Sequence, residues 1–205
     1  MKVDIGFLLD SSKSLQPNYK RLKNFLLTLA DTFDINYYDS RAAVITFSWY
    51  AKHSIRLRDH ANMASFKSAV DDIPLLGSTT RIDRPLRLAE KKMFRPTNGA
   101  RSGVAKILVI LTDGGGSDTI TRYTTSEDPV DIADSLRNEG ITLVVIGLGP
   151  SVDTVALNKI AGGRDKAIFV SDFQDLVDKE FVTSVKKKLC QGKVLIELVI
   201  FLPIT

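Results

Sequence analysis

The chain has 205 residues, of which 44% are hydrophobic and 25% are charged, and its formal net charge is +4 at pH 7. This length suits one ordinary α/β domain, and this composition argues against a disordered chain or a coiled coil. The basic residues are spread among acidic ones, which disfavours a nucleic-acid partner, and no apolar run reaches the ~20 residues that membrane insertion needs.

The first part of the chain predicts a strand, a helix and a hairpin. Residues 3–9 form an apolar run of strand length, and residues 19–33 place apolar side chains at three- and four-residue intervals, which predicts an amphipathic helix. A second apolar segment, residues 42–47, is followed after a short turn by residues 51–57. Because this connection is too short for a crossover, residues 51–57 predict an antiparallel strand at the sheet edge.

The rest of the chain alternates between helical and strand-like stretches. Weaker helical patterns cover residues 63–70, 84–94, 130–138, 155–161 and 173–189, and apolar segments recur at residues 106–111, 142–148 and 166–170. Only strands covered on both faces are so uniformly apolar, so the alternation predicts βαβ units around a parallel sheet. The predicted fold class is α/β: a doubly wound, mostly parallel six-stranded sheet with one antiparallel edge strand and helices on both faces.

The end of the chain departs from this alternation. We expect one domain over residues 1–190 and a carboxyl-terminal tail of unknown role over residues 191–205. Its closing stretch, KVLIELVIFLPIT, is strand-like and suits an extra edge strand, the start of a following module or a segment foreign to the domain. The only cysteine, Cys190, has no internal disulfide partner, and a free thiol and a disulfide whose partner lies outside this chain are both open.

Two acidic motifs close predicted strands. DSSKS, from Asp10 to Ser14, ends the first strand, and Asp113 ends the third in LVILTDG. Ligand sites in doubly wound sheets form at the carboxyl ends of the strands, beside the point where strand order reverses. If the first and third strands are neighbours, the two carboxylates approach each other, and a divalent cation would remove their repulsion.

Hydroxyl groups next to Asp10 indicate which cation would suit this position. Ser12 and Ser14 alternate along an extended turn, so both side chains can point the same way as Asp10. An all-oxygen set without soft ligands favours Mg²⁺ or Mn²⁺, since Ca²⁺ usually takes more carboxylates. The simpler alternative is that Asp10 caps the following helix and the serines form a turn.

A third motif completes the pattern. In LLGSTTRID, Gly77 permits a tight turn and Thr79 offers a hydroxyl just before a helix. Together the D-x-S-x-S motif, the Gly-x-Thr turn and the strand-ending T-D-G resemble the von Willebrand factor A-type domain and the integrin inserted domain, over about residues 3–189. The resemblance implies a Rossmann-like fold and a metal-ion-dependent adhesion site. In that site the hydroxyls of Ser12, Ser14 and Thr79 would bind the ion, and Asp10 and Asp113 would hold it largely through waters.

The surroundings of the predicted site differ in places from the family pattern. Ser11, Lys13 and Ser78 occupy positions that often hold Gly or another small residue, and none of these changes removes a metal-binding oxygen. The polar loop of residues 114–129 borders the site and could set specificity. The residues predicted to form a partner-binding rim are Lys13, Ser78, Thr80, Gly114, Ser117 and Asp118.

The resemblance implies a divalent-metal-dependent protein-binding module of extracellular adhesion or matrix type. Its partner would be a matrix or cell-surface protein that offers a Glu or Asp carboxylate, and neighbouring domains are expected in a longer chain. The alternative is a structural matrix scaffold or spacer in which metal-dependent binding matters little. An enzyme is disfavoured, because the sequence has no phosphate-binding loop, no G-x-S-x-G elbow and no histidine beside the carboxylates. We expect surface or edge-strand roles for His53 and His60.

Overall fold

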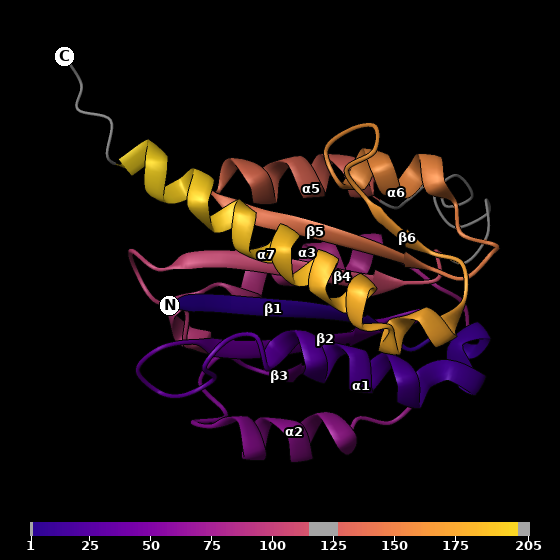
Figure 1. The fold of residues 1–205 in the computed structure, drawn as a ribbon, viewed down its shortest axis with the longest axis horizontal. Helices are drawn as coiled ribbons and strands as arrows, with labels where there is room; N and C mark the ends of the chain where they lie inside the picture. The colour runs from indigo at the N-terminus through magenta and orange to yellow at the C-terminus, as the bar shows by residue number, and fades with distance from the viewer. Residues whose placement is uncertain (1, 115–126, 201–205) are drawn as a thin grey trace.

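The computed structural model describes residues 2–114 and 127–200, and it describes the side chains of the last helix as far as Leu189. Six strands form one sheet in the order β3-β2-β1-β4-β5-β6 (Figure 1). All neighbouring strands pair in parallel except β2 and β3, which are antiparallel, so the predicted fold class is confirmed. The strands are β1 Val3–Asp10, β2 Arg41–Phe47, β3 Ala51–Ile55, β4 Ala105–Thr112, β5 Ile141–Leu148 and β6 Ile168–Val170.

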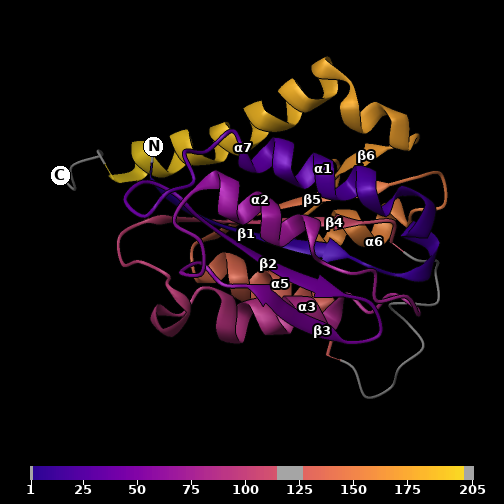
Figure 2. The same ribbon diagram turned by 90° about the horizontal axis from the view of Figure 1, so that it is seen from below.

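Helices cover both faces of the sheet (Figure 1 and Figure 2). One face carries α1, α2 and α7, and the other carries α3, α5 and α6. Because successive residues of a strand point to opposite faces, β1 contributes Phe7 and Leu9 to the first layer and Leu8 to the second. The helices are α1 Tyr19–Ala30, α2 Met63–Asp71, α3 Asp83–Leu88, α5 Pro129–Asn138, α6 Thr154–Ile160 and α7 Lys179–Ile200.

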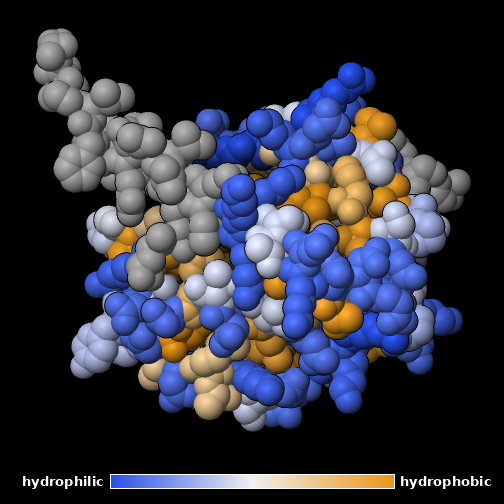
Figure 3. Space-filling view, viewed as in Figure 1, coloured by the Kyte–Doolittle hydropathy of each residue, from blue (hydrophilic) through white to orange (hydrophobic). Residues whose placement is uncertain are grey.

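The outer surface of these layers follows the amphipathic pattern of the sequence. On the face that carries α1 and α7, hydrophilic residues dominate, and hydrophobic residues show mainly between the elements (Figure 3). The apolar stripe of α1 predicted from its three- and four-residue spacing is buried, with Leu22, Leu26 and Leu29 fully inaccessible. No helix in the described parts of the chain combines the length and apolar character needed to cross a membrane.

Two predicted helices are interrupted. The stretch predicted over residues 84–94 is α3 followed by a π-helical turn, Ala89–Met93. The stretch predicted over residues 173–189 is a 3₁₀ turn, Phe173–Val177, and then α7. Asp178 separates them with extended backbone angles, and its carboxylate accepts a hydrogen bond of 2.8 Å from the backbone N–H of Phe181. An aspartate that caps the next helix in this way ends the preceding turn.

The strand-like prediction for the closing stretch is wrong as far as Ile200. Residues 193–200 continue α7 as helix, through the expected domain boundary at residue 190. The apolar and β-branched composition of this stretch suits a strand, but once a helix has formed, each added residue gains one backbone hydrogen bond. Residues 201–205 lie outside the described residues.

Candidate metal centre

The two acidic motifs meet at the centre of the sheet. Strands β1 and β4 are parallel neighbours, and their register pairs Leu9 with Leu111, so Asp10 and Thr112 follow side by side at the carboxyl ends. The chain runs from β1 to β2 on one side and reaches β4 on the other, so strand order reverses here. This is the position at which doubly wound sheets form ligand sites.

Asp10 is fully buried at this point. One carboxylate oxygen accepts a hydrogen bond of 2.9 Å from the backbone N–H of Ser12, and the other accepts one of 2.6 Å from the hydroxyl of Thr112. Loss of solvent, with a further contribution from the charge of Asp113, raises the pKa of Asp10 to about 7, although both hydrogen bonds act to lower it. The site therefore holds this carboxyl group in place while disfavouring its negative charge.

A chain of oxygens leads from Asp10 toward solvent. The hydroxyl oxygens of Ser12 and Ser14 lie 3.1 Å apart, and the hydroxyl of Ser14 donates to a carboxylate oxygen of Asp113. Ser12 is buried whereas Ser14 is exposed and Asp113 half-buried, so the group opens to the surface at one end. Four of the five predicted ligands are thus joined by contacts that the structure shows directly.

The fifth predicted ligand, Thr79, lies in a loop whose preceding residues contact the DSSKS loop, and no hydrogen bond joins its side chain to the other four among the described residues. The N–H of Lys13 donates to the carbonyl of Ser78 over 3.0 Å, which holds the loop before α3 against the DSSKS loop. Gly77 and Ser78 both adopt left-handed angles, with φ of 71° and 70°. Thr79 follows directly and is exposed. A serine at φ 70° is strained where a glycine would not be, and such strain clusters at functional sites.

Two residues that organise the site were not predicted. Thr112 holds Asp10, and Ser11 anchors the neighbouring loop by accepting the N–H of Leu76 at its hydroxyl over 2.7 Å and the N–H of Gly77 at its carbonyl over 2.9 Å. Thr112 stands in the quoted T-D-G motif, so the pairing of β1 with β4 would have pointed to it. Ser11 carries no such signal, since the loop that its hydroxyl anchors at Leu76 lies 65 positions away.

The helix-cap alternative for Asp10 is not what the structure shows. The carboxylate bonds to the N–H of Ser12 within the loop. The segment that follows is a 3₁₀ turn, Lys13–Asn18, and α1 begins only at Tyr19. Asp10 therefore stabilises a local turn through Ser12, which agrees with the turn-forming part of that alternative, but it caps no α-helix.

The predicted rim is placed unevenly. Lys13 and Ser78 are exposed and Gly114 is half-buried. Thr80 is only 5% exposed and lines a small cavity with Thr112 and Gly114. The chain turns inward there, since the N–H of the next residue, Arg81, bonds to the carbonyl of Ser48 over 2.9 Å. Ser117 and Asp118 lie outside the described residues.

The side chains at this site suit a hard divalent cation. The described residues contain no group of three or more His, Cys, Asp or Glu side chains that could hold a metal. What they bring together here is two carboxylates, Asp10 and Asp113, with the hydroxyls of Ser12 and Ser14. The partners of Asp10 are a hydroxyl and a backbone N–H, and a cation would favour its ionised form. Hydroxyl, carboxylate and water oxygens are the donors that Mg²⁺ and Mn²⁺ prefer.

Comparison with known proteins supplies a family. The model described as "von Willebrand factor type A domain" matches residues 4–180. Human von Willebrand factor A domain-containing protein 2 is 30% identical over 175 residues, which is 85% of this chain and 22% of that protein. The human collagen alpha-6(VI) chain is 31% identical over 189 residues, 90% of this chain and 8% of the relative. The chain thus spans less than a quarter of the length of either relative.

A solved structure shows the same fold. Proximal thread matrix protein 1 from the mussel byssus matches 93% of this chain and 48% of its own, with a TM-score of 0.82 and 25% identity. A second structure of that mussel protein is described as having a zinc-occupied MIDAS motif and matches 86% of this chain and 45% of its own, with a TM-score of 0.76 and 26% identity.

Proposed function

Because the chain belongs to the von Willebrand factor type A domain family, we propose that it is a protein-binding module of the extracellular matrix that captures a partner's acidic side chain through a divalent cation. The observation that carries this proposal is the buried Asp10, which is held by two hydrogen bonds and has no basic partner among the described residues, next to the Ser12–Ser14–Asp113 chain of oxygens. A cation at this point would balance both carboxylates.

The proposed ligands divide into two kinds. The hydroxyls of Ser12, Ser14 and Thr79 would bind the cation directly, and Asp10 and Asp113 would hold it largely through water. When bound, the ion supplies a Lewis-acidic position facing solvent, which a Glu or Asp of the partner protein can fill. Mg²⁺ or Mn²⁺ suits these donors, and the zinc in the mussel protein's MIDAS motif supports divalent occupancy.

The exposed Lys13 adds a positive charge at the mouth of this site. Its backbone N–H is bonded to the carbonyl of Ser78, which keeps this residue between Ser12 and Ser14 at the proposed site. A positive charge at that place raises the rate of encounter with an acidic surface more than it raises affinity. Lys13 would therefore favour acidic partners.

The relatives support the location and the class of partner. One is a collagen chain and another is named a thread matrix protein, so we place this protein outside the cell, in contact with matrix or cell-surface proteins. Both curated relatives are far longer than this chain, which supports neighbouring domains. We assign the module no catalytic activity, since capture of a carboxylate needs no bond-breaking step.

Metal binding tests the site directly. Mn²⁺ titrated into the full chain, followed by electron paramagnetic resonance and calorimetry, is expected to show one site in the wild type and at least about a tenfold loss of affinity in Asp113→Ala. Asp71→Ala, at the exposed end of α2, is the matched control and should bind as the wild type does. Equal binding by all three proteins would remove Asp113 from the site.

Partner capture is tested with a peptide pair. A short peptide containing one Glu should bind the Mn²⁺-loaded protein and alter the Mn²⁺ spectrum, whereas the same peptide with Gln should not. Chelator should abolish the effect. If matrix proteins bind this chain equally well with and without chelator, the scaffold or spacer function replaces the proposal.

A further inference from the structure

A second charged feature lies on the opposite layer of the molecule, between α3 and the edge strand β3. Two adjoining cavities of about 360 and 490 Å³ share the lining residues Ala51, Leu88, Lys91 and Lys92. We call this continuous surface the cationic groove. Its other charged lining residues are Arg56, Asp83, Arg84, Arg87 and Glu127, with His53, Thr97 and Asn98.

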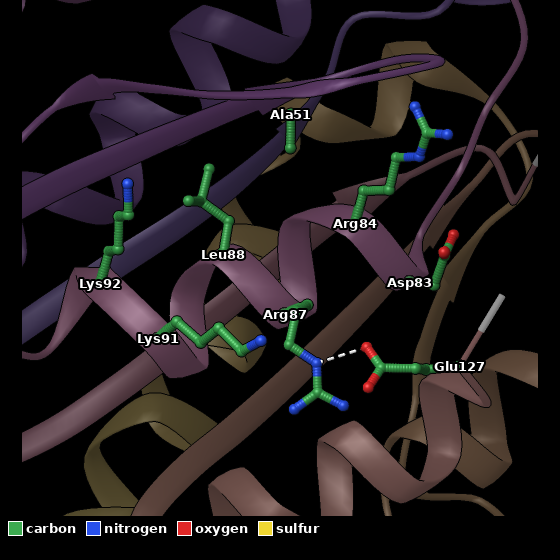
Figure 4. Close-up of a pocket in the computed structure, with 8 residues that line it drawn as sticks. All are labelled: Ala51, Asp83, Arg84, Arg87, Leu88, Lys91, Lys92 and Glu127. Carbon is green, nitrogen blue, oxygen red and sulfur yellow. Dashed lines mark hydrogen bonds and ion pairs between the residues drawn. The ribbon is translucent and has the colours of Figure 1, made fainter.

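The cations of this groove follow the length of one segment. Arg84, Arg87, Lys91 and Lys92 recur through α3 and the π-helical turn after it, and they flank the groove on two sides. In Figure 4, Arg84, Leu88 and Lys92 project toward the β3 side and Ala51, whereas Arg87 and Lys91 lie on the side of Glu127. From Arg84 to Lys92 this row extends for about 12 Å, at 1.5 Å per residue.

The acidic residues near the groove are already paired. Asp83 binds Arg81 with an N–O distance of 2.7 Å, and Glu127 binds Arg87 at 2.6 Å. Glu90 also pairs with Arg87. Asp59, a further carboxylate nearby, accepts the backbone N–H of Arg56 over 2.8 Å and offsets part of the positive charge there. Of the remaining cations, Lys91 and Lys92 form no ion pair with a carboxylate of the described residues.

Those remaining cations face the open part of the groove. Lys91, Lys92 and Arg56 are exposed and make no side-chain ion pair with the described residues. Arg84 donates to the carbonyl of Trp49 over 2.5 Å and lies 5.0 Å from the centre of its ring, so it is oriented while keeping its charge. The groove therefore carries a local excess of positive charge that the described part of the fold does not balance.

His53, which also lines the groove, is affected by the same excess of positive charge. Its Nε2 is buried and has no hydrogen-bond partner. Burial lowers the pKa of His53, the charges of Arg56 and Lys92 lower it further, and Asp59 opposes them. The positive charges of Arg56 and Lys92 therefore act on the part of the groove that His53 lines, where a bound anion would offset them.

We propose that the cationic groove binds a sulfated polysaccharide chain of the glycosaminoglycan type. Such a chain carries anionic groups at regular intervals, as the row of cations requires, and Leu88 and Ala51 give an apolar floor for the faces of its sugar rings. A single phosphate or peptide carboxylate would instead need donors that converge on one point. The choice of polysaccharide over nucleic acid rests on the proposed extracellular location, where sulfated chains are the abundant polyanions.

The test uses the full chain and a heparin oligosaccharide of defined length. Its affinity is measured by calorimetry over a series of salt concentrations, for the wild type and for the groove variant Arg56→Gln/Lys91→Gln/Lys92→Gln. The control variant Lys20→Gln/Lys187→Gln/Lys188→Gln removes the same charge from exposed lysines of α1 and α7. Circular dichroism and thermal unfolding confirm that each variant is folded.

The groove variant is expected to lose at least about tenfold in affinity, and its salt dependence should weaken by roughly one counterion per cation removed. The control variant should bind within about twofold of the wild type. In the wild type, saturating oligosaccharide should also shift the nuclear magnetic resonance signals of the His53 ring. Absence of binding by the wild type, or equal losses in the two variants, would overturn the proposal.

Two further measurements distinguish the cationic groove from the metal centre and a polysaccharide from an acidic peptide. Asp113→Ala and chelator should leave heparin binding unchanged, so this proposal can fail while the metal centre stands, or the reverse. If chelator abolishes heparin binding, the polyanion sits at the metal centre and not in the groove. If a polyglutamate peptide binds the groove as tightly as heparin, and loses affinity in the same variant, the occupant is an acidic peptide and the polysaccharide assignment is wrong.

Discussion

Strand β1 carries a fully buried aspartate near each end, and the two have different partners. Asp4, near the amino end, accepts hydrogen bonds from the backbone N–H and the guanidinium of Arg101 at 2.7 to 2.9 Å. That guanidinium also donates to the carbonyls of Val3, Tyr38 and Asp39. Asp10, at the carboxyl end, has Thr112 and the N–H of Ser12.

The difference shows how one residue type serves two purposes in one strand. Taking a carboxylate out of water costs several kcal/mol unless a cation and hydrogen bonds compensate for it. At Asp4 the fold supplies the cation, and the resulting ion pair ties together three segments of chain. At Asp10 the described residues supply only neutral donors, a hydroxyl and a backbone N–H, which leaves room for the positive charge of the proposed cation. Asp4 therefore stabilises the fold through its ion pair with Arg101, whereas Asp10 is the aspartate that we propose takes part in metal binding.

The largest effect on stability is expected at Asp4, which forms the ion pair with Arg101. Arg101→Met leaves Asp4 buried without a cation, and it should lower the free energy of unfolding by about 3–5 kcal/mol, with or without Mg²⁺. Urea denaturation measures this loss. Arg164→Met, at an exposed position, should cost less than about 0.5 kcal/mol. A loss below about 1 kcal/mol at Arg101 would erase the contrast between the two aspartates.

The stability of the fold should depend on pH through Asp10 when divalent ions are absent. Burial, with the charge of Asp113, raises the pKa of Asp10 from its ordinary value of 3.8 to about 7, so folding favours the protonated form. This contribution to stability is complete below about pH 4 and is lost as the pH rises through 7, by an amount on the order of 4 kcal/mol. The free energy of unfolding is measured by urea denaturation over a range of pH for the wild type and for Asp10→Asn, and the difference between the two isolates the contribution of Asp10. A difference that does not change with pH would contradict the prediction.

Mg²⁺ should stabilise the molecule only through the proposed metal centre at Asp10 and Asp113. At one hundred times its dissociation constant, a ligand that binds only the folded state adds about 2.7 kcal/mol. We expect this gain in the wild type, as a higher midpoint of thermal unfolding, and its absence in Asp113→Ala. Arg101→Met should keep the gain despite its lower stability. A gain of equal size in Asp113→Ala would place the ion elsewhere.

The smallest change in stability is expected for Ser14→Ala, which separates the effect of a site residue on folding from its effect on metal binding. Ser14→Ala removes the exposed hydroxyl that contacts both Ser12 and Asp113. The metal-free protein should lose no more than about 1 kcal/mol, because the group is open to water. Mg²⁺ affinity, measured by calorimetry, should nevertheless fall about tenfold. Ser68→Ala, on the exposed side of α2, is the control and should change neither quantity.

The sequence determined the fold class and much of the candidate site. Uniformly apolar segments alternating with helical periodicity predict a covered parallel sheet, and a motif that ends such a segment must lie at its carboxyl edge. Asp10, Ser12, Ser14 and Asp113 could be predicted because each is next to such an end, and the contact between β1 and β4 then brought them together.

Tertiary structure alone decided the partners of each buried charge. Arg101 lies 97 positions from Asp4 and Thr112 lies 102 positions from Asp10, and nothing local in the sequence links the members of either pair. The burial of Thr80, the break at Asp178 and the cationic groove likewise depend on how distant segments pack. Periodicity records which face of an element is buried. The register between strands determines which side chain meets a carboxylate there, and that register is fixed only when the whole sheet assembles.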